Sequence, residues 1–157
     1  MIRVADAIPT SLVARSEILA TVTRLRDDGY TLLVDLFAYD TPERSDRFDV
    51  VYLLHRLADG ARVRVKVHAA EGEDVPTVTG VFPAADWYER EVYDLYGVAF
   101  DGHPDLRRIL MPDDWMGYPL RRDHPLGGEV VEYGLPGEPG HRDTIAPLEF
   151  PEGTVRS

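Results

Sequence analysis

The stretch that decides the fold runs from Trp87 to Leu126 and reads WYEREVYDLYGVAFDGHPDLRRILMPDDWMGYPLRRDHPL. It is denser in aromatic, charged, proline and glycine residues than the rest of the chain. Its first half predicts an amphipathic helix over residues 84–96, because apolar residues recur at helical spacing and Gly97 can take the left-handed position that ends a helix. Four prolines in the second half exclude a long helix or a central strand there. We expect that half to run extended over a surface.

One carboxylate of the predicted helix falls inside its apolar stripe. On a helical wheel Glu91 lies between Trp87 and Leu95, whereas Glu89 and Arg90 fall on the more polar sides. A buried carboxylate needs a cationic partner or several hydrogen bonds. We therefore expect Glu91 to be buried and paired with an arginine of the following segment. The candidates are Arg107, Arg108, Arg121 and Arg122.

The same stretch carries charged residues, glycines and prolines at fixed spacing. They are Glu89, Arg90, Glu91, Asp94, Gly97, His103, Pro104, Leu106, Arg107 and Arg108, then Gly117 and the run Pro119-Leu120-Arg121-Arg122-Asp123. This pattern resembles the signature of the thirty-kilodalton subunit family of respiratory complex I, which is the C subunit of bacterial NADH-quinone oxidoreductase. It spans roughly forty residues and is far more specific than a short glycine-rich motif. A weaker resemblance covers residues 12–83, and the tail after residue 126 carries no motif that we can place.

The resemblance implies a non-catalytic structural and assembly subunit of a proton-translocating NADH-quinone oxidoreductase of the respiratory chain. Such a subunit is peripheral, in the hydrophilic arm on the cytoplasmic side of the cell membrane. It braces the quinone-site (D) subunit and the small iron–sulfur (B) subunit, with the I subunit as a further candidate neighbour. It holds no cofactor, because the flavin and the iron–sulfur clusters lie on partner subunits.

Residues 107–126 are predicted to form the main docking surface. The prolines deny this segment regular backbone pairing, yet it holds too many large side chains for a linker. A chain of this kind gains order by lying on a neighbour, with Trp, Tyr and Arg as anchors. The predicted interface residues are Arg107, Arg108, Trp115, Tyr118, Pro119, Leu120, Arg121, Arg122 and Asp123.

Composition excludes several classes of protein. The chain has 157 residues, of which 44% are hydrophobic, and this suits one domain with a real core. The net charge of −11 argues against nucleic acid and against direct adhesion to anionic lipid, so we expect contact with a membrane only through a complex. Cysteine is absent, which excludes disulfides and cysteine-ligated zinc or iron–sulfur clusters. With neither a membrane span nor a signal peptide pattern, we expect a soluble chain made in the cytoplasm.

The sequence before residue 84 predicts a small α+β layer. Residues 11–28 are expected to form an amphipathic helix that stops at Gly29. Residues 30–39 are apolar on both faces, which predicts a central strand covered on both sides. Residues 49–57 predict the next strand, and the Asp59-Gly60 pair after it predicts a hairpin turn of type I′.

The strand that follows has the clearest alternation in the chain, with Val63, Val65 and Val67 between charged residues. The expected fold is therefore α+β, a small mixed or antiparallel sheet with two packed helices, followed by an extended proline-rich C-terminal segment. The expected parts are an α+β domain (1–100), a docking segment (101–126) and a Gly/Pro-rich tail (127–157). The composition of the tail predicts either disorder or an extended course along a partner.

Two other interpretations stay open at this point. Related subunits serve membrane-bound hydrogenases and similar complexes, and genomic neighbours would separate these cases. In a different class, Glu91 and Asp94 could form an acid–base pair that His103 completes as the site of a free-standing metal hydrolase. No serine or cysteine nucleophile accompanies them, and pairing of glutamate with arginine explains the same charges.

Overall fold

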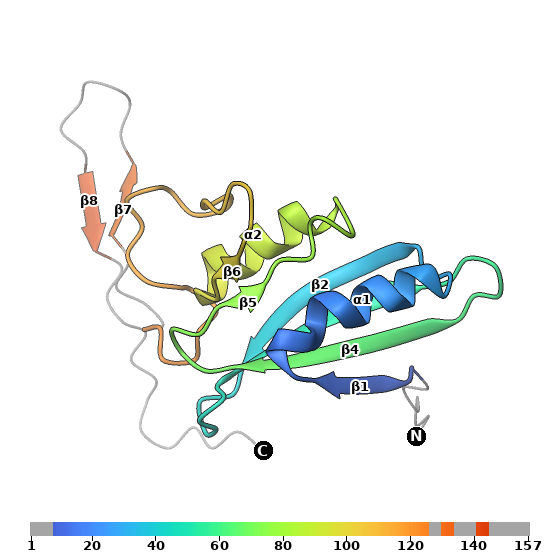
Figure 1. The fold of residues 1–157 in the computed structure, drawn as a ribbon. Coiled ribbons are helices and arrows are strands. Elements are labelled where there is room, and N and C mark those ends of the chain that lie inside the picture. The colour runs from blue at the N-terminus through green and yellow to red at the C-terminus, as the bar shows by residue number, and fades with distance from the viewer. Residues whose placement is uncertain (1–7, 126–129, 134–140, 145–157) are drawn as a thin grey trace, which may run out of the picture. The chain divides into compact units, whose positions relative to one another are not determined.

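The first part of the chain is built on a four-stranded mixed sheet, against which two helices pack (Figure 1). The computed structural model describes residues 8–125, 130–133 and 141–144. The chain divides into two compact units, residues 1–122 and 123–157. In the first unit the strand order is β1-β4-β3-β2, with β1 parallel to β4 and the other pairs antiparallel. The strands are β1 (Thr10–Val13), β2 (Leu32–Asp40), β3 (Phe48–His55) and β4 (Arg62–Ala69).

Strand β1 occupies residues that the sequence predicted as the start of a helix. The helical part of residues 11–28 begins later, with a 3₁₀ turn η1 (Arg15–Glu17) and helix α1 (Ile18–Asp27). The helix prediction is wrong for residues 11–13, because they pair in parallel with the main chain of β4. Local periodicity does not reveal such a pairing. The end of the helix is as predicted, with Gly29 at a φ of 97°.

Strand β2 lies at an edge of the sheet, so the prediction of a central strand is wrong. Its side chains alternate between buried and exposed, and Val34, Phe37 and Tyr39 on the outward face are partly exposed. The apolar outward face misled the prediction, because apolar residues on both faces are typical of a strand that is covered on both sides. The interior positions belong to β3 and β4.

The hairpin between β3 and β4 forms as predicted, but its turn is not of type I′. A type I′ turn needs positive φ at both central residues, and no described residue other than glycine has one. Of the Asp59-Gly60 pair, only Gly60 has a positive φ, at 73°. The main-chain N–H of Arg56 donates to Ala61 O at 2.8 Å and that of Gly60 donates to Arg56 O at 3.0 Å, so the loop is longer than two residues.

Helix α2 (Ala85–Tyr96) agrees with the predicted helix, and Gly97 ends it at a φ of 73°. Residues of α1, α2 and the sheet share one hydrophobic core, so the predicted α+β class with two packed helices is confirmed. Two short strands, β5 (Val75–Pro76) and β6 (Phe100–Asp101), pair with each other in parallel. In the sequence, β5 precedes α2 and β6 follows it. The largest fully buried side chains include Ile18, Val22, Leu36, Phe48, Val50, Tyr52, Leu54, Val65 and Val67.

The second unit contains a strand pair that the sequence did not predict. Strand β7 (Val130–Tyr133) pairs antiparallel with β8 (His141–Thr144). The rest of the tail lies outside the described residues. Within the described part of the chain, no helix has the length and apolarity needed to cross a membrane.

Candidate functional site

Asp94 ties the segment after helix α2 to that helix. Its Oδ2 accepts hydrogen bonds from the main-chain N–H groups of Ile109 (3.0 Å), Leu110 (2.7 Å) and Met111 (2.9 Å). Its Oδ1 accepts one from Arg108 Nη1 at 2.7 Å. Burial alone would raise the pKa of Asp94, but these hydrogen bonds outweigh it and hold the pKa below its usual value. Asp94 is therefore a fully buried structural clamp.

Arg108 extends this clamp along residues 101–122, which we call the signature segment. Its Nη2 donates to Gly117 O at 3.0 Å, and its guanidinium lies 5.3 Å from the centre of the Tyr118 ring. Arg90, which is also buried, donates from Nε to Arg107 O at 3.2 Å. The Arg107 side chain points outward, is 71% exposed and pairs with Asp105 at 3.0 Å.

Arg121 forms a second clamp at the end of α2. Its Nε donates to Tyr96 O at 2.6 Å, and its guanidinium pairs with Glu71. The guanidinium also stacks on the Tyr118 ring, 4.4 Å from its centre, and lies 5.1 Å from that of Phe48. A cation is favourable here because the last carbonyl groups of a helix carry partial negative charge. Beside it, the N–H of Leu120 donates to a carbonyl of the same turn, Leu95 O, at 3.1 Å.

The main chain of Arg122 is fixed by a third contact. Its N–H donates to Asp40 Oδ2 at 2.9 Å, and Asp40 is itself held by Arg47 through two hydrogen bonds of 2.7 Å. The hydrogen bonds from Arg47 are the chief cause that lowers the pKa of Asp40. The Arg122 side chain is 64% exposed and reaches Glu43 at 3.3 Å. The surface over which the signature segment runs is thus the surface of its own unit.

The second buried carboxylate of α2, Glu89, pairs with no arginine among the described residues. Its Oε1 accepts from the N–H of Val78 at 2.8 Å and its Oε2 from Thr77 Oγ1 at 2.5 Å. The side chain of His103 is buried, and its Nε2 lies 3.1 Å from Asp86 Oδ1 and 3.9 Å from Glu89 Oε2. Burial raises the pKa of Glu89 to about 7, against the effect of its two hydrogen bonds.

The prediction for Glu91 is wrong, because its side chain is exposed. The buried charged residues of α2 are Glu89, Arg90 and Asp94. The helical wheel assumed one buried face, whereas α2 packs on the sheet with one side and receives residues 77–78 and 107–111 on others. Contacts with chain that is distant in sequence cannot be read from helical periodicity.

The hydrolase interpretation finds no support in this geometry. Asp94 uses both carboxylate oxygens on Arg108 and main-chain N–H groups, Glu91 is exposed, and His103 faces Asp86 and Glu89. The three residues that the sequence combined therefore have separate surroundings. Among the described residues, no group of three or more His, Cys, Asp or Glu side chains could hold a metal ion.

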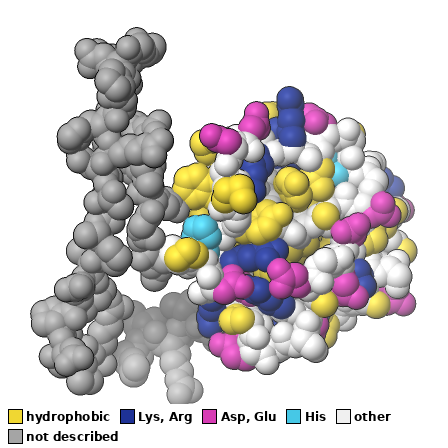
Figure 2. Space-filling model, turned by 90° about the vertical axis from the view of Figure 1, so that its left-hand side faces the viewer, with side chains coloured by type: hydrophobic (Ala, Val, Ile, Leu, Met, Phe, Trp, Pro, Cys, Tyr) yellow, Lys and Arg dark blue, Asp and Glu magenta, His cyan; other side chains and the backbone are white. Residues whose placement is uncertain are grey.

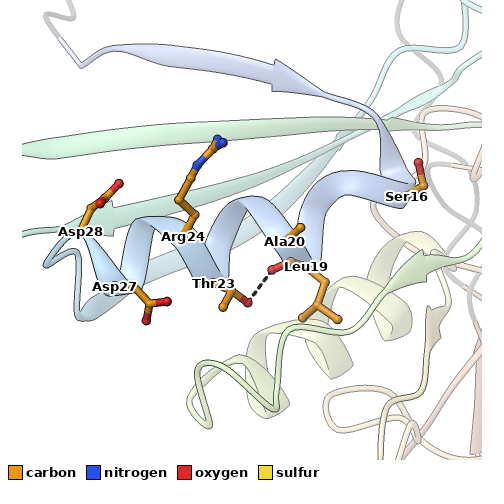
Figure 3. Close-up of a pocket in the computed structure, with 7 residues that line it drawn as sticks. All are labelled: Ser16, Leu19, Ala20, Thr23, Arg24, Asp27 and Asp28. Atoms are coloured by element: carbon orange, nitrogen blue, oxygen red, sulfur yellow. Dashed lines mark hydrogen bonds between the residues drawn. The ribbon is translucent and has the colours of Figure 1, made fainter.

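A shallow hollow along α1 does not form a site either (Figure 3). All of its lining residues come from one stretch, residues 16–28, and their side chains diverge along the helix. The interaction drawn there is the hydroxyl of Thr23 donating to Leu19 O at 2.7 Å, a contact within the helix.

The predicted interface residues divide into two groups. Arg108 and Arg121 are turned inward as clamps, while Trp115, Tyr118 and Pro119 are half-buried. The exposed members are Arg107, Leu120, Arg122 and Asp123. Two further apolar residues of the predicted docking segment, which are not among the predicted interface residues, are exposed, Leu110 at 55% and Met116 at 85%. Their position on a proline-rich segment was the available signal. Figure 2 shows hydrophobic side chains on one face of the first unit, with basic and acidic side chains beside them.

The Glu89 carboxyl makes stability depend on pH. Because its folded pKa of about 7 lies above the ordinary 4.5, its contribution is fully present below pH 4.5 and is lost as the pH rises through 7. Glu89→Gln keeps an acceptor for Val78 and does not titrate. When the pH is raised from 4 to 8, the difference in free energy of unfolding between this variant and the parent chain should shift in favour of the variant by on the order of 3 kcal/mol. Urea unfolding at both pH values measures it.

The matched control is Glu91→Gln, two positions along the same helix and exposed. Its effect should be within about 0.5 kcal/mol at both pH values. A Glu89→Gln variant whose difference from the parent chain is the same at pH 4 and pH 8 would contradict the assignment of a neutral buried carboxyl.

Comparison with known proteins identifies the family of this chain. The family model described as respiratory-chain NADH dehydrogenase, 30 Kd subunit, matches residues 11–130. The C subunit of the NADH-quinone oxidoreductase of Phenylobacterium zucineum is 58% identical over 110 residues, which cover 69% of this chain and 53% of that protein. The corresponding C subunit of Sinorhizobium medicae is 51% identical over 124 residues, which cover 76% and 62%. The chain thus spans about half to three-fifths of the length of these relatives.

Two solved structures share the fold. The trypsin-resistant fragment (1–134) of Nqo5 has a TM-score of 0.58 and 36% identity, covering 62% of this chain and 81% of that chain. A chain of the membrane-bound sulfane sulfur reductase, an archaeal respiratory membrane complex, has a TM-score of 0.66 and 28% identity, covering 73% and 69%. The expected resemblance is confirmed, and the chain belongs to the family of the 30 kDa subunit of respiratory-chain NADH dehydrogenase.

Proposed function

We propose that this chain is a non-catalytic subunit in the hydrophilic arm of a proton-translocating NADH-quinone oxidoreductase, where it braces the quinone-site subunit and the small iron–sulfur subunit. The observation that carries the proposal is the double clamp on the signature segment. Asp94 holds that segment at residues 108–111, and Arg121 holds it near its C-terminal end. The charged signature residues thus serve to position a surface, which is the work of an assembly subunit.

In this proposal the redox chemistry lies on partner subunits. Iron–sulfur clusters are held by cysteine thiolates, and the chain contains no cysteine. The flavin and the clusters would then sit in neighbouring chains on the cytoplasmic side of the membrane. The identities of 58% and 51% to C subunits of NADH-quinone oxidoreductases support this kind of assembly.

The outward side chains of the signature segment have the chemistry of a binding surface. Leu110, Met116 and Leu120 are exposed, and Arg107 and Arg122 extend beside them. Apolar groups next to arginines are typical of the residues that contribute most to interfaces. Because the main chain beneath them is already fixed, a partner binds without a large loss of conformational entropy.

A second candidate is a related subunit of another respiratory membrane complex. The likeness to a chain of the sulfane sulfur reductase complex favours it. The higher identity to the C subunits of NADH-quinone oxidoreductases favours the first proposal. Purification of the tagged chain from solubilised native membranes decides, because NADH-dependent quinone reduction would accompany it only in the first case.

The surface is tested by Leu110→Ser combined with Met116→Ser in the full-length chain in its native membranes. We expect the amount of assembled complex on a native gel to fall about tenfold or more, because two exposed apolar anchors are lost. The urea unfolding midpoint of the isolated chain should hardly change, since both side chains are exposed.

The matched control is Leu57→Ser, which removes an equally exposed leucine from the turn between β3 and β4, at the far end of the sheet from the signature segment (Figure 1). Complex levels should stay normal in this variant. Normal assembly of the double variant would reject the signature segment as the docking surface.

A further inference from the structure

Strand β2 is an edge strand, and its pairing with β3 is regular from Asp35 onward, after a β-bulge or irregularity between Leu33 and Asp35. It pairs with β3 only, and within the described part of the chain no strand lies on its other side. Natural edge strands discourage further pairing with lysine or proline, and β2, with the sequence LLVDLFAYD, contains neither. Val34, Phe37 and Tyr39 are partly exposed along it. An edge of this kind is a template for another extended chain.

A groove of about 200 Å³ lies between this edge and helix α2. Residues 35–38 border it on the strand, Glu91, Val92 and Leu95 border it on the helix, and Leu120 contributes from the signature segment. Alternate side chains of a strand point to opposite faces. A groove bordered by four residues in succession therefore follows the main-chain edge of β2 rather than one of its faces. We call it the edge groove.

Two hydrogen bonds from neighbouring elements lie at the edge groove. The hydroxyl of Tyr88 donates to Val34 O at 3.3 Å, just before the bordering residues. The N–H of Leu120 donates to Leu95 O at 3.1 Å, which fixes the leucine beside the groove. The part of β2 that borders the groove, residues 35–38, is four residues long, roughly 13 Å at the rise of a strand. It suits a short extended segment.

The charge of the edge groove determines which kind of extended segment would bind there. Among the described residues, Asp35 and Glu91 are its charged lining residues, and none of those that line it is basic. Tyr96 also lines it, and its pKa is raised, chiefly by burial and further by the carboxylates of Asp40 and Glu91. The apolar part of the lining comes from Leu36, Val92 and Leu95. This combination is complementary to a lysine or arginine next to apolar residues.

We propose that an extended segment of a partner chain adds to the free edge of β2 in the edge groove and places a lysine or arginine beside Asp35 and Glu91. A second copy of this chain is a poor occupant, because pairing β2 with itself would bring together two strands that carry Asp35 and Asp40 and no basic residue. The net charge of −11 adds to that repulsion. The proposal needs an assembly, as the proposed function does, but it uses the edge of β2, and Leu120 belongs to both surfaces.

The test places the photoreactive residue p-benzoylphenylalanine at position 37 of the full-length chain, in the complex purified from native membranes. Phe37 borders the edge groove and is partly exposed. After irradiation we expect one partner segment to be cross-linked, with a lysine or arginine within about three residues of the linked position. Adding Glu91→Lys should lower the cross-link yield about tenfold, because a cation replaces an anion in the groove. Glu91→Gln should lower it less.

The same photoreactive residue at position 57 is the control and should give no such product. A cross-link to a second copy of this chain, a linked segment without a basic residue, or the absence of any partner product would overturn the proposal. An unchanged yield with Glu91→Lys would overturn it as well. All these measurements are made on assembled complex, so they stand apart from the assembly defect that tests the signature segment. The urea unfolding midpoint of Glu91→Lys shows that an altered yield is not caused by unfolding.

Discussion

Replacing Asp94 by asparagine is expected to lower the free energy of unfolding by about 3–5 kcal/mol. The asparagine oxygen can still accept from the main chain of Ile109, Leu110 and Met111, but the side-chain amide then faces Arg108, which is a donor. A largely buried guanidinium loses its counter-charge while the volume of the site stays the same. Urea unfolding followed by the fluorescence of Trp87 and Trp115 measures the loss.

The pH dependence gives this prediction a second readout. Because the pKa of Asp94 is lowered from the ordinary 3.8, its contribution is present above that value and is lost as the pH falls through the folded pKa. The difference between Asp94→Asn and the parent chain should therefore shrink in acid. Glu91→Gln, three positions earlier and exposed, should be neutral within about 0.5 kcal/mol. Equal losses in the two variants would mean that Asp94 is not a clamp.

Local features of the fold were predictable from sequence because their causes are local. Helix α2 is specified by apolar spacing and by the glycine that follows it, and the hairpin between β3 and β4 by alternating valines next to a polar turn. The family was recognisable for a similar reason, since its signature is a nearly continuous stretch. The position of β2 at an edge was not predictable, because it depends on where β1 pairs.

The sequence named residues of α2 and of the signature segment, but it did not give the geometry in which they lie. The signature residues lie where sequence placed them on α2, yet the buried carboxylates are Glu89 and Asp94 rather than Glu91. Their partners are main-chain N–H groups of residues 78 and 109–111, and side-chain patterns carry no information about main-chain donors. The same holds for Arg121, whose partner is a carbonyl at the end of the helix. Contacts with segments that are distant in sequence thus determine which charged side chains of α2 are buried.

The close contact at Gly97 gives the other large expected effect. Its φ of 73° is unfavourable for other residues, and a Cβ there would lie 2.5 Å from the Tyr118 ring and 2.6 Å from Arg121 Nη2. Gly97→Ala should therefore destabilise the chain by about 2–5 kcal/mol, through backbone strain and through displacement of the second clamp. Urea unfolding gives the size of the loss, and amide exchange of residues 118–122 should become faster as the segment detaches.

Gly60→Ala separates the two causes. Gly60 has the same φ of 73°, but a Cβ there would meet no atom within 4 Å, so this variant should lose only the strain of about 1–2 kcal/mol. The excess loss at Gly97 then measures the packing of the signature segment against the end of α2. In a Tyr118→Ala background the ring is gone, and the cost of Gly97→Ala should fall toward that of Gly60→Ala. If the two glycine variants cost the same in the parent chain, Tyr118 and Arg121 move aside freely, and the second clamp does not hold the docking surface in place.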